Sequence, residues 1–485
     1  MKLRSIALIT GLGLGLMGCT KTDLGTPSTP TCNKEEVICN EAANIFVDGT
    51  NGNDTADGSS KYPVKSISHA LDLAKTGTKK SIIISTGDYP ENIDLVNGIS
   101  LRGQYDSQNE WKRSTTSTTT IRNVSGKEYS GVTTSFGLQG ENLTSPTTLS
   151  RISVIAKDAF DSKGNGASSI GFHCVNCGGL VMEDMNISAG AAGAGIEWVP
   201  NSAGAIGTDG ENGVSSTCQL AVGPNGGLGA NGPNGNSGGK GGRGGNSTAP
   251  TQGENGASGL PYGSGGGKAG VDKGENGENG NNGSDGADGT NATNGQDGNG
   301  GSGGGGAAGA SFFTRNYEGN SAGGGGAGGA GGQSGRGGKG GGSSIALFLI
   351  NSTGAKLVGT NFFTSANAAD GRSGEAGGKG GTGGKGGKGG STSICRTITV
   401  MGIAGDGGHG GNGGHAGSGG SGAGGSSVGI LLANTVLNDG ADIKNLVQIS
   451  TGLPGKGGAP AASAISLPTE AGKNGEAKDI LIISQ

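Results

Sequence analysis

The side chains best suited to chemistry stand in three short stretches of the sequence. The first is His-Cys-Val-Asn-Cys, with His173, Cys174 and Cys177. Imidazole and thiolate groups at this spacing can bind a metal, and two cysteines this close can also form a disulfide. Cys174 falls at an apolar position of a predicted strand, which favours a core or disulfide cysteine. A thioredoxin-like reactive pair would need a helix to begin after the first cysteine, and no helical pattern follows it.

The second stretch lies in a glycine-rich tract, where Asp406, His409 and His415 are spaced among glycines. These groups could chelate a metal weakly. Metal ligands must be oriented by the structure around them, and a mobile glycine loop orients them poorly. We therefore predict no metal site and no cofactor.

The third stretch is the acidic pair Glu183-Asp184, which lies on a predicted strand. Neighbouring residues of a strand point to opposite faces, so these carboxylates cannot serve one site as general acid and base. Asp158 and Asp161 are nearby, in a predicted turn. We expect a protein that is not an enzyme. The alternatives are a carbohydrate-active enzyme or a polysaccharide-binding protein, and an inert stalk is a third hypothesis.

A strand signature that occurs four times must position these residues. Small polar residues open each copy, apolar residues alternate through it, and an asparagine closes it. The copies are Thr134–Asn142, Ser168–Asn176, Ser343–Asn351 and Ser426–Asn434. They begin 34, 175 and 83 residues apart, so their strands can stack as successive coils only if the chain between them loops out.

Period-two alternation places one set of side chains on the inner face of these strands. That set is Phe136, Leu138, Ile170, Phe172, Cys174, Ile345, Leu347, Leu349, Val428, Ile430 and Leu432. The closing asparagines, Asn142, Asn176, Asn351 and Asn434, are expected at a bend, because asparagine accepts left-handed backbone geometry. A second strand follows each copy, within 151–156, 180–188, 356–363 and 443–450, and 479–484 is expected to close the end.

Glycine supplies 114 of the 485 residues, mostly in two tracts between the copies. Gly274–Gly301 follows a period of three, but residues 271–303 lack the proline that collagen needs. Tracts such as 377–390 lack the aspartate of calcium-binding glycine repeats. Two alternatives stay open: flexible loops, or packed polyglycine II helices with glycine inward and polar residues outward. We expect Ser311–Tyr317 to pin this excursion to the coil.

The residues before the first copy predict a strand, a loop and a helix, and then three short strands. Ile67, Ala70, Leu71 and Ala74 form one apolar helix face, with Ser66 or Ser68 as its N-cap. The strands are expected in 81–86, 87–95 and 98–106.

Several motifs in this block resemble the N-terminal module of right-handed parallel β-helix proteins, the pectin-lyase-like superfamily. They are Val47-Asp48-Gly49 with Gly52, Tyr62-Pro63, Gly87-Asp88-Tyr89, Glu91-Asn92-Ile93, Leu101–Asp106, Trp111 and Arg113. The resemblance covers about residues 44–190, and Gly103-Gln104 departs from the family's Gly-Gly. It implies an all-β, right-handed parallel β-helix whose N-terminal helix caps the core. It also implies that the asparagines form an internal ladder; the glycine-rich insertions are similar to those of PGRS proteins.

The first residues predict a lipoprotein signal. Lys2 and Arg4 precede a short apolar run, and Leu16-Met17-Gly18-Cys19 has the form of a lipobox. Cleavage before Cys19 would leave a lipidated cysteine that attaches the protein to a membrane, and Thr20 favours the outer membrane. Six cysteines then remain in an oxidising compartment. Cys32 with Cys39 bounds a small loop, and Cys218 with Cys395 is a further candidate pair.

Loss of Lys2 and Arg4 would take the formal net charge from −4 to −6, which makes nucleic acid an unexpected partner. We divide the chain into a signal (1–18), linker (19–43), β-helix (44–190), glycine-rich insertion (191–342), coil (343–369), second insertion (370–425) and final coils (426–485). The expected function is display at the cell surface, through contacts with glycans, matrix or neighbouring cells. The oligomeric state stays open.

Overall fold

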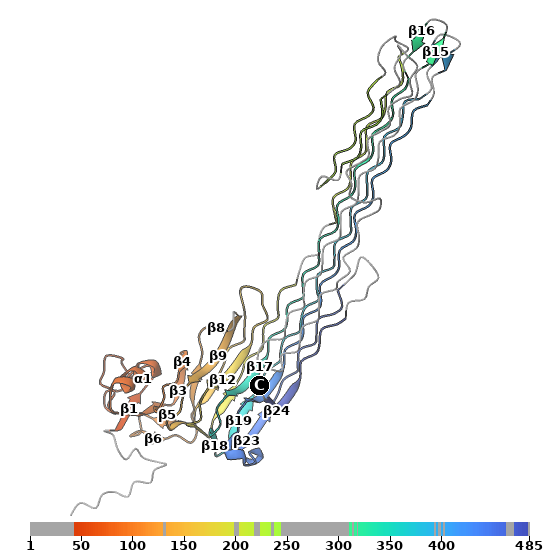
Figure 1. The fold of residues 1–485 in the computed structure, drawn as a ribbon. Helices are drawn as coiled ribbons and strands as arrows, with labels where there is room; N and C mark the ends of the chain where they lie inside the picture. The colour runs from red at the N-terminus through yellow and green to blue at the C-terminus, as the bar shows by residue number, and fades with distance from the viewer. Residues whose placement is uncertain are drawn as a thin grey trace, which may run out of the picture.

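A stacked-strand body carries a long narrow stalk in the computed structural model of the chain (Figure 1). The structure describes residues 43–129, 132–197, 203–217, 224–233, 237–243, 310–312, 315–317, 319–391, 394–395, 399–400, 403–461 and 470–483. The predicted period-three stretch Gly274–Gly301 lies outside these residues.

The body is an all-β parallel β-helix built from three sheets, as predicted. The first sheet contains, in spatial order, β1 (Asn44–Val47), β2 (Ser81–Ser85), β5 (Ser100–Asp106), β10 (Thr147–Ser150), β13 (Leu180–Glu183) and β18 (Lys356–Val358). The second contains β3 (Gly87–Pro90), β7 (Thr119–Arg122), β11 (Ser153–Ile155), β14 (Asn186–Ser188), β19 (Asn361–Thr364) and β23 (Val447–Ser450). The third contains β4 (Ile93–Asp94), β9 (Val132–Glu141), β12 (Ser169–Val175), β17 (Ser344–Ile350), β22 (Ser427–Ala433) and β24 (Ala477–Ile483).

Two short strands extend this arrangement antiparallel to their neighbours: β6 (Lys112–Arg113) beside β5, and β8 (Lys127–Tyr129) beside β9. Near the C-terminal end lie two short 3-10 turns, Asn438–Gly440 and Lys444–Leu446. Each coil from β2 to β22 contributes one strand to each main sheet, and the last coil contributes only β23 and β24. Phe172, for example, is paired with Leu138 of the coil before and Leu347 of the coil after.

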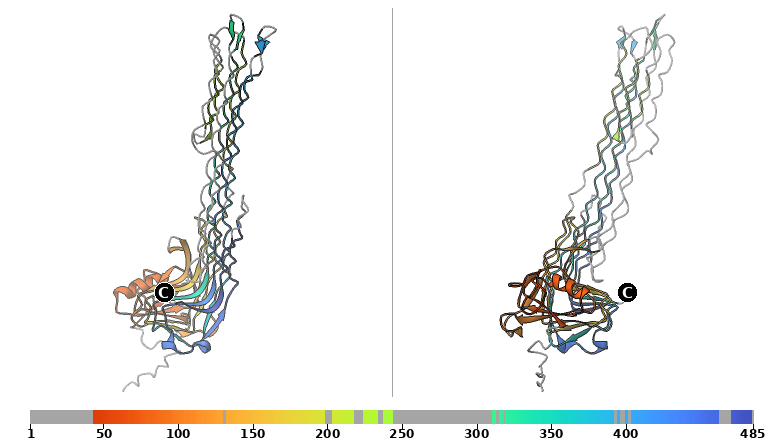
Figure 2. Two further views of the ribbon diagram at one scale, coloured as in Figure 1. Left: turned by 45° about the vertical axis from the view of Figure 1, so that its right-hand side comes forward. Right: turned by 90° about the vertical axis from the view of Figure 1, so that its left-hand side faces the viewer.

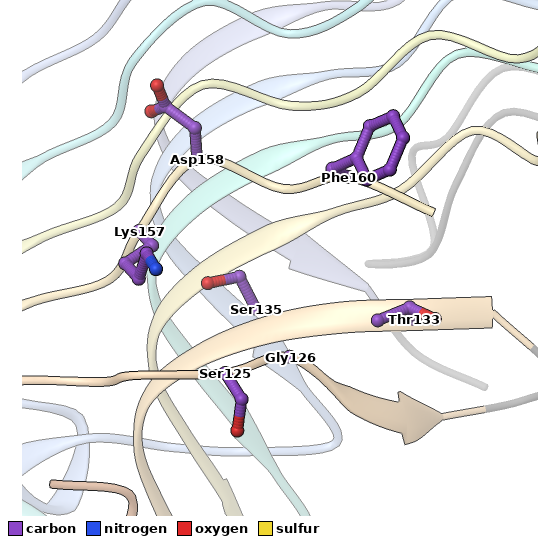
Figure 3. Close-up of a pocket in the computed structure, with 7 residues that line it drawn as sticks. All are labelled: Ser125, Gly126, Thr133, Ser135, Lys157, Asp158 and Phe160. Carbon is purple, nitrogen blue, oxygen red and sulfur yellow. The ribbon is translucent and has the colours of Figure 1, made fainter. Parts of the chain in front are cut away.

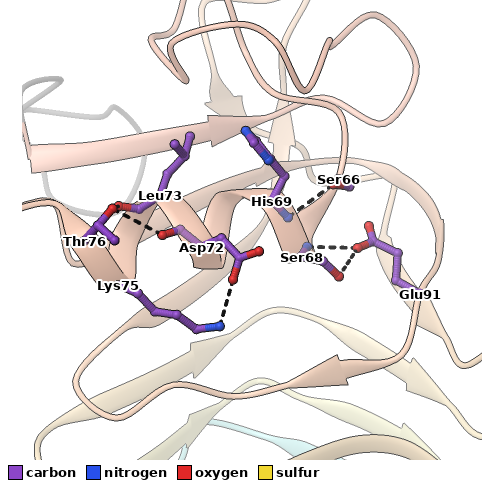
Figure 4. A network of polar contacts seen from close by, with 8 residues as sticks. All are labelled: Ser66, Ser68, His69, Asp72, Leu73, Lys75, Thr76 and Glu91. Carbon is purple, nitrogen blue, oxygen red and sulfur yellow. Dashed lines mark hydrogen bonds and ion pairs between the residues drawn. The ribbon is translucent and has the colours of Figure 1, made fainter.

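Helix α1 (Ile67–Thr76) covers the first coil, and its buried residues are the predicted Ile67, Ala70, Leu71 and Ala74. Ser66 is the N-cap, since its hydroxyl accepts the His69 N–H at 3.2 Å. Glu91, from the segment after β3, accepts the backbone N–H groups of Ile67 and Ser68, both at 2.9 Å (Figure 4). A carboxylate thus satisfies free amides at the positive end of the helix dipole and ties the helix to the first coil.

The second strand predicted after each copy is wrong in detail, because a turn divides two of these four segments into two strands of different sheets. Residues 180–188 become β13 and β14, and 356–363 become β18 and β19. Asp184 and Gly359 occupy the two turns with φ of 50° and 69°. A left-handed residue there bends the chain between sheets, which period-two reasoning does not reveal.

The first apolar position of each copy also differs from the prediction. Phe136, Ile170, Ile345 and Val428 do not join the main core but a second buried cluster with Phe348, Leu431 and Ala433. Phe348 lies between the core residues Leu347 and Leu349, so this cluster is on the opposite face of the sheet. Alternation breaks at the next residue, where the Cα of Gly171 faces Ile187 inside the coil.

Three consecutive coils send out glycine-rich excursions at one corner, between the second and third sheets. The excursions join β14 to β17, β19 to β22 and β23 to β24. The first two are the predicted insertions. The third, 451–476, falls within a segment predicted as β-helix coils. It is short, and it was not recognised from the sequence as an excursion.

The excursions pack as hydrogen-bonded arms that form the stalk (Figure 2). Successive returning arms, 319–342 and 403–425, are parallel: Gly323, Gly326 and every third residue to Gly341 donate to the carbonyl 82 positions later. Outgoing arm 370–391 is antiparallel to both, with N–H donors at Arg372, Glu375 and every third residue to Gly390 bonding arm 319–342. Three residues per turn is the repeat of polyglycine II, so the described tracts follow the second alternative, not flexible loops.

Small residues fill the centre of the stalk. Residues 320–330 are all buried, and contain only glycine, alanine, serine and asparagine. A Cβ atom at Gly326 would collide with the carbonyl group of Gly384 in arm 370–391. Glycine is required here because the backbones approach more closely than any side chain allows.

The expected role of Ser311–Tyr317 as a pin to the coil is wrong. β15 (Ala310–Phe312) and β16 (Arg315–Tyr317) form an antiparallel hairpin at the far tip of the stalk (Figure 1). A second short hairpin, β20 (Ile394–Cys395) with β21 (Thr399–Val400), joins arms 370–391 and 403–425. Residues with β propensity therefore mark reversals between arms.

Replacing Glu91 with alanine should destabilise the body, because it leaves the amides of Ile67 and Ser68 without their charged acceptor. We expect a loss of about 1–2 kcal/mol in the free energy of unfolding, measured by urea titration. Glu110→Ala is the control, since among the described residues that exposed carboxylate forms an ion pair only with Lys112. Equal loss in both variants would contradict the capping role.

Candidate functional site

Three adjoining hollows form a groove on the body, beside the base of the stalk. Its central hollow measures 170 Å³ and is lined by Ser125, Gly126, Thr133, Ser135, Lys157, Asp158 and Phe160 (Figure 3). A hollow of 380 Å³ beside Arg122 shares Lys157 and Asp158, and one of 290 Å³ beside Asn92 shares Ser125 and Gly126. The groove thus runs across three successive coils.

Asparagines fix the floor of this groove. The side-chain Oδ1 of Asn92 accepts the Val124 N–H at 2.9 Å, and the Oδ1 of Asn123 accepts the Lys157 N–H at 2.7 Å. Asn123 is buried, and its amide donates to the Ser135 hydroxyl at 3.0 Å. Each coil therefore sets the position of the next at this corner.

The charged groups of the groove already have partners. Arg122 is paired with Asp88 at 2.8 Å and Lys127 with Asp94 at 3.1 Å. Asp158 accepts the Ala191 N–H at 2.7 Å, and the Lys157 ammonium donates to the Val124 carbonyl at 3.3 Å. These contacts hold the charged side chains in place around the groove, where they can bind a polar ligand.

An exposed aromatic ring and a structural aspartate bound the same groove. The Phe160 ring is 78% exposed, which offers a flat apolar surface beside polar groups. Asp161, its neighbour, is buried. Burial raises the pKa of Asp161, but hydrogen bonds from Asn165 and Thr133 outweigh it, so the pKa lies below its usual range. Asp161 is therefore ionised at neutral pH and organises the loop.

The predicted cysteine pair is a disulfide. Cys174 and Cys177 are bonded to each other, and both are fully buried in the core. His173 points to the opposite face, between the rings of Phe136 and Phe348 at 5.3 and 5.0 Å. No group of three metal-binding side chains occurs among the described residues.

The stalk uses Asp406, His409 and His415 as hydrogen-bond acceptors that join two of its arms. Together with Asn412 and Ser418 they lie at every third position of arm 403–425, and their side chains accept N–H groups of arm 370–391. Asp406 Oδ1 accepts from Gly389 at 2.7 Å, and the Nδ1 atoms of His409 and His415 accept from Gly386 and Gly380 at 3.2 Å. The three-residue repeat spreads these groups along the arm at about 9 Å per turn, too far apart to share one metal ion.

The acidic pair is separated by the turn after β13. Asp184 lies in that turn, where it pairs with Arg151 at 3.3 Å and accepts the Thr360 N–H at 2.9 Å. Glu183 ends β13, with its backbone in register with Val358. The premise that both residues lie on one strand is wrong, and Asp184 has a structural partner on each side.

The closing asparagines occupy one corner, with φ of 55°, 57°, 49° and 47° at Asn142, Asn176, Asn351 and Asn434. All four side chains are exposed, so they form no internal ladder. Asn176 donates to Asn142 at 3.0 Å.

Serines form the buried ladder that sequence reasoning missed. The Ser168 hydroxyl accepts the Ser343 N–H at 2.8 Å, and the Ser343 hydroxyl accepts the Ser426 N–H at 3.0 Å. The small polar residues that open each copy were the sequence feature from which this ladder could have been predicted.

Several predicted residues lie outside the described part of the chain. They are Cys19, Cys32, Cys39 and Cys218; for Cys395 the structure describes the backbone in β20. Within the described residues, no helix has the length and apolar character required to cross a bilayer.

The stability of the body should fall with acidification because of His173. Burial lowers the pKa of His173 from 6.5 to about 4, so the folded protein keeps it neutral while the unfolded chain takes up a proton below pH 6.5. The stability contribution is therefore complete above pH 6.5 and is lost towards pH 4, by about 3 kcal/mol.

His173→Phe should remove that component, since phenylalanine extends the ring stack without titrating. The measurement is the free energy of unfolding between pH 7 and 4, with His69→Gln as the control. Identical pH profiles for wild type and His173→Phe would exclude this contribution.

Comparison with known proteins gives a family match in the N-terminal coils. The family described as Protein of unknown function (DUF1565) matches residues 50–135. No curated protein sequence matches the chain. Among solved structures, GH136 lacto-N-biosidase from Eubacterium ramulus is similar at 10% identity and a TM-score of 0.21, over 30% of this chain and 27% of that one. Pectin methylesterase PemA from Erwinia chrysanthemi is similar at 11% identity and a TM-score of 0.15, over 30% and 54%. The chain covers less than two thirds of each of these enzymes.

Proposed function

We propose that this protein is a lipid-anchored protein of the cell envelope that displays its stalk for contact with glycans, matrix or neighbouring surfaces. One observation carries the proposal: three successive coils send their excursions out at a single corner, where they pack into one hydrogen-bonded bundle. A bundle of this kind extends far from the body (Figure 1). A stalk with these properties would hold a contact surface away from the body of the protein.

The expected lipobox at Leu16-Met17-Gly18-Cys19 supports attachment of the body to a membrane. A lipidated cysteine with more than one acyl chain holds a protein stably at a bilayer. Residues 19–43 would then separate the body from the membrane, and the stalk would bring its tip into the surroundings.

A second function is supported by the groove on the body. The exposed Phe160 ring lies beside Ser125 and Lys157, and an aromatic surface next to hydrogen-bonding groups suits a sugar. Polysaccharide binding or turnover at this groove is the alternative. Turnover of a polysaccharide panel that is lost in Phe160→Ala, with the exposed Phe362→Ala as a control outside the groove, would favour it over display.

Disrupting the stalk while keeping the body should abolish surface contact. In Gly326→Val the new side chain collides with the Gly384 carbonyl group, so the arms must separate. Gln333→Val is the matched control, because residue 333 lies on the exposed row of the same arm. Cells that express each variant are compared for attachment to matrix-coated surfaces, and external protease on intact cells reports whether the protein is exposed.

We expect loss of attachment for Gly326→Val and unchanged attachment for Gln333→Val, with both proteins cleaved from outside. Attachment of Gly326→Val cells at the wild-type level would exclude display by the stalk. Complete protection from external protease would also exclude it, because the protein would then face the periplasm.

A further inference from the structure

One face of the stalk carries a straight row of cations. Arm 370–391 repeats every three residues, so Lys379, Thr382, Lys385 and Lys388 point the same way, and all four are exposed. The glycines between them face neighbouring arms. Successive positions of the row lie about 9 Å apart along the arm, the rise of one three-residue turn. We call Lys379, Lys385 and Lys388 the lysine row.

The backbone beneath the lysine row is held on both sides. The N–H groups of Gly384 and Gly387 donate to Ala327 and Gly324 of arm 319–342, both at 2.7 Å. The N–H groups of Lys385 and Lys388 donate to Asp209 and Asn212 of arm 203–217, at 2.7 and 2.8 Å. The bundle thus sets the backbone positions of the three lysines before any partner arrives, which lowers the entropy cost of binding.

The lysine row has no carboxylate partner among the described residues. The nearby acids serve the backbone instead: Asp209 accepts the Lys385 N–H, and Asp406 accepts the Gly389 N–H. Elsewhere cations form ion pairs within the chain, as in the pairs Lys127–Asp94, Lys163–Glu128 and Arg336–Glu375. Three aligned ammonium groups that form no ion pair within the described residues are an attractive site for a linear polyanion.

We propose that the lysine row binds an acidic polysaccharide that lies along the stalk. The proposal rests on the display function and names its partner class. A carboxylated or sulfated glycan distributes its charges at intervals along an extended chain, and the hydroxyl groups of Thr382 and Ser391 extend the same row for its sugars. Nucleic acid fits less well, since its charges are far denser and no aromatic side chain interrupts the row for base stacking.

Purified full-length protein is titrated with fluorescent polygalacturonate and dextran sulfate, and with neutral dextran and single-stranded DNA for comparison. The test variant carries Lys379→Gln, Lys385→Gln and Lys388→Gln. The control carries Lys61→Gln, Lys65→Gln and Lys112→Gln, which removes equal charge from exposed positions of the body. Thermal unfolding of each variant verifies that the fold is kept.

We expect both polyanions to bind wild type and control alike, and the test variant about tenfold more weakly, because three exposed ion contacts are lost. Binding to wild type should weaken as salt rises, and neutral dextran should not bind. Equal affinity of wild type and test variant would overturn the proposal. So would an equal loss in the control, or preferential binding of the DNA.

The attachment assay separates this proposal from the display function. Loss of attachment in Gly326→Val with full attachment in the triple lysine variant rejects the lysine row and retains display. Wild-type attachment of Gly326→Val cells rejects display itself.

Discussion

The backbone hydrogen bond between one layer and the next is the interaction on which both body and stalk depend. In the body it joins β12 to β17 and β17 to β22, residue by residue. In the stalk the same layers continue: arm 203–217 donates to arm 370–391, and arm 319–342 donates to arm 403–425. The stalk is therefore the β-helix stack prolonged at one corner, with a change from strand to three-residue helix.

Composition follows from how many neighbours an arm has. The central part of arm 319–342 is surrounded and contains only small residues, whereas Gln333 and Arg336 appear further along the same arm, where their side chains reach solvent. Residues 377–390 and 405–414 have two glycines and one outward side chain in each turn, whereas arm 203–217 has one glycine in each turn. Those outward side chains are not passive, since Asp406, Asn412 and His415 accept amides that no carbonyl reaches. A high glycine content here marks backbone that is closely packed against neighbouring arms, not a flexible segment.

Much of the fold could be predicted because it depends on local periodicity. The face of α1, the four copies and the asparagines at positive φ all follow from side-chain spacing and backbone preference. Other features depend on non-local contacts that no single strand encodes. Ile170 faces outward because the alternation of side chains breaks at Gly171. Asp184 lies in a turn, although the sequence around it has the pattern of a continuous strand. The groove joins Asn92, Ser125 and Lys157 from three coils, and only the stack brings them together.

The three-residue repeat of the stalk limits how its length can change during evolution. Removal of one residue from arm 370–391 would rotate everything beyond it by a third of a turn, so that lysines would face the centre and glycines the solvent. Insertions and deletions can therefore survive only in whole triplets. Because each arm is bonded to partners on several sides, a triplet gained in one arm favours matching gains in the others. Related chains should differ in stalk length by shared multiples of three, while the coils keep their size.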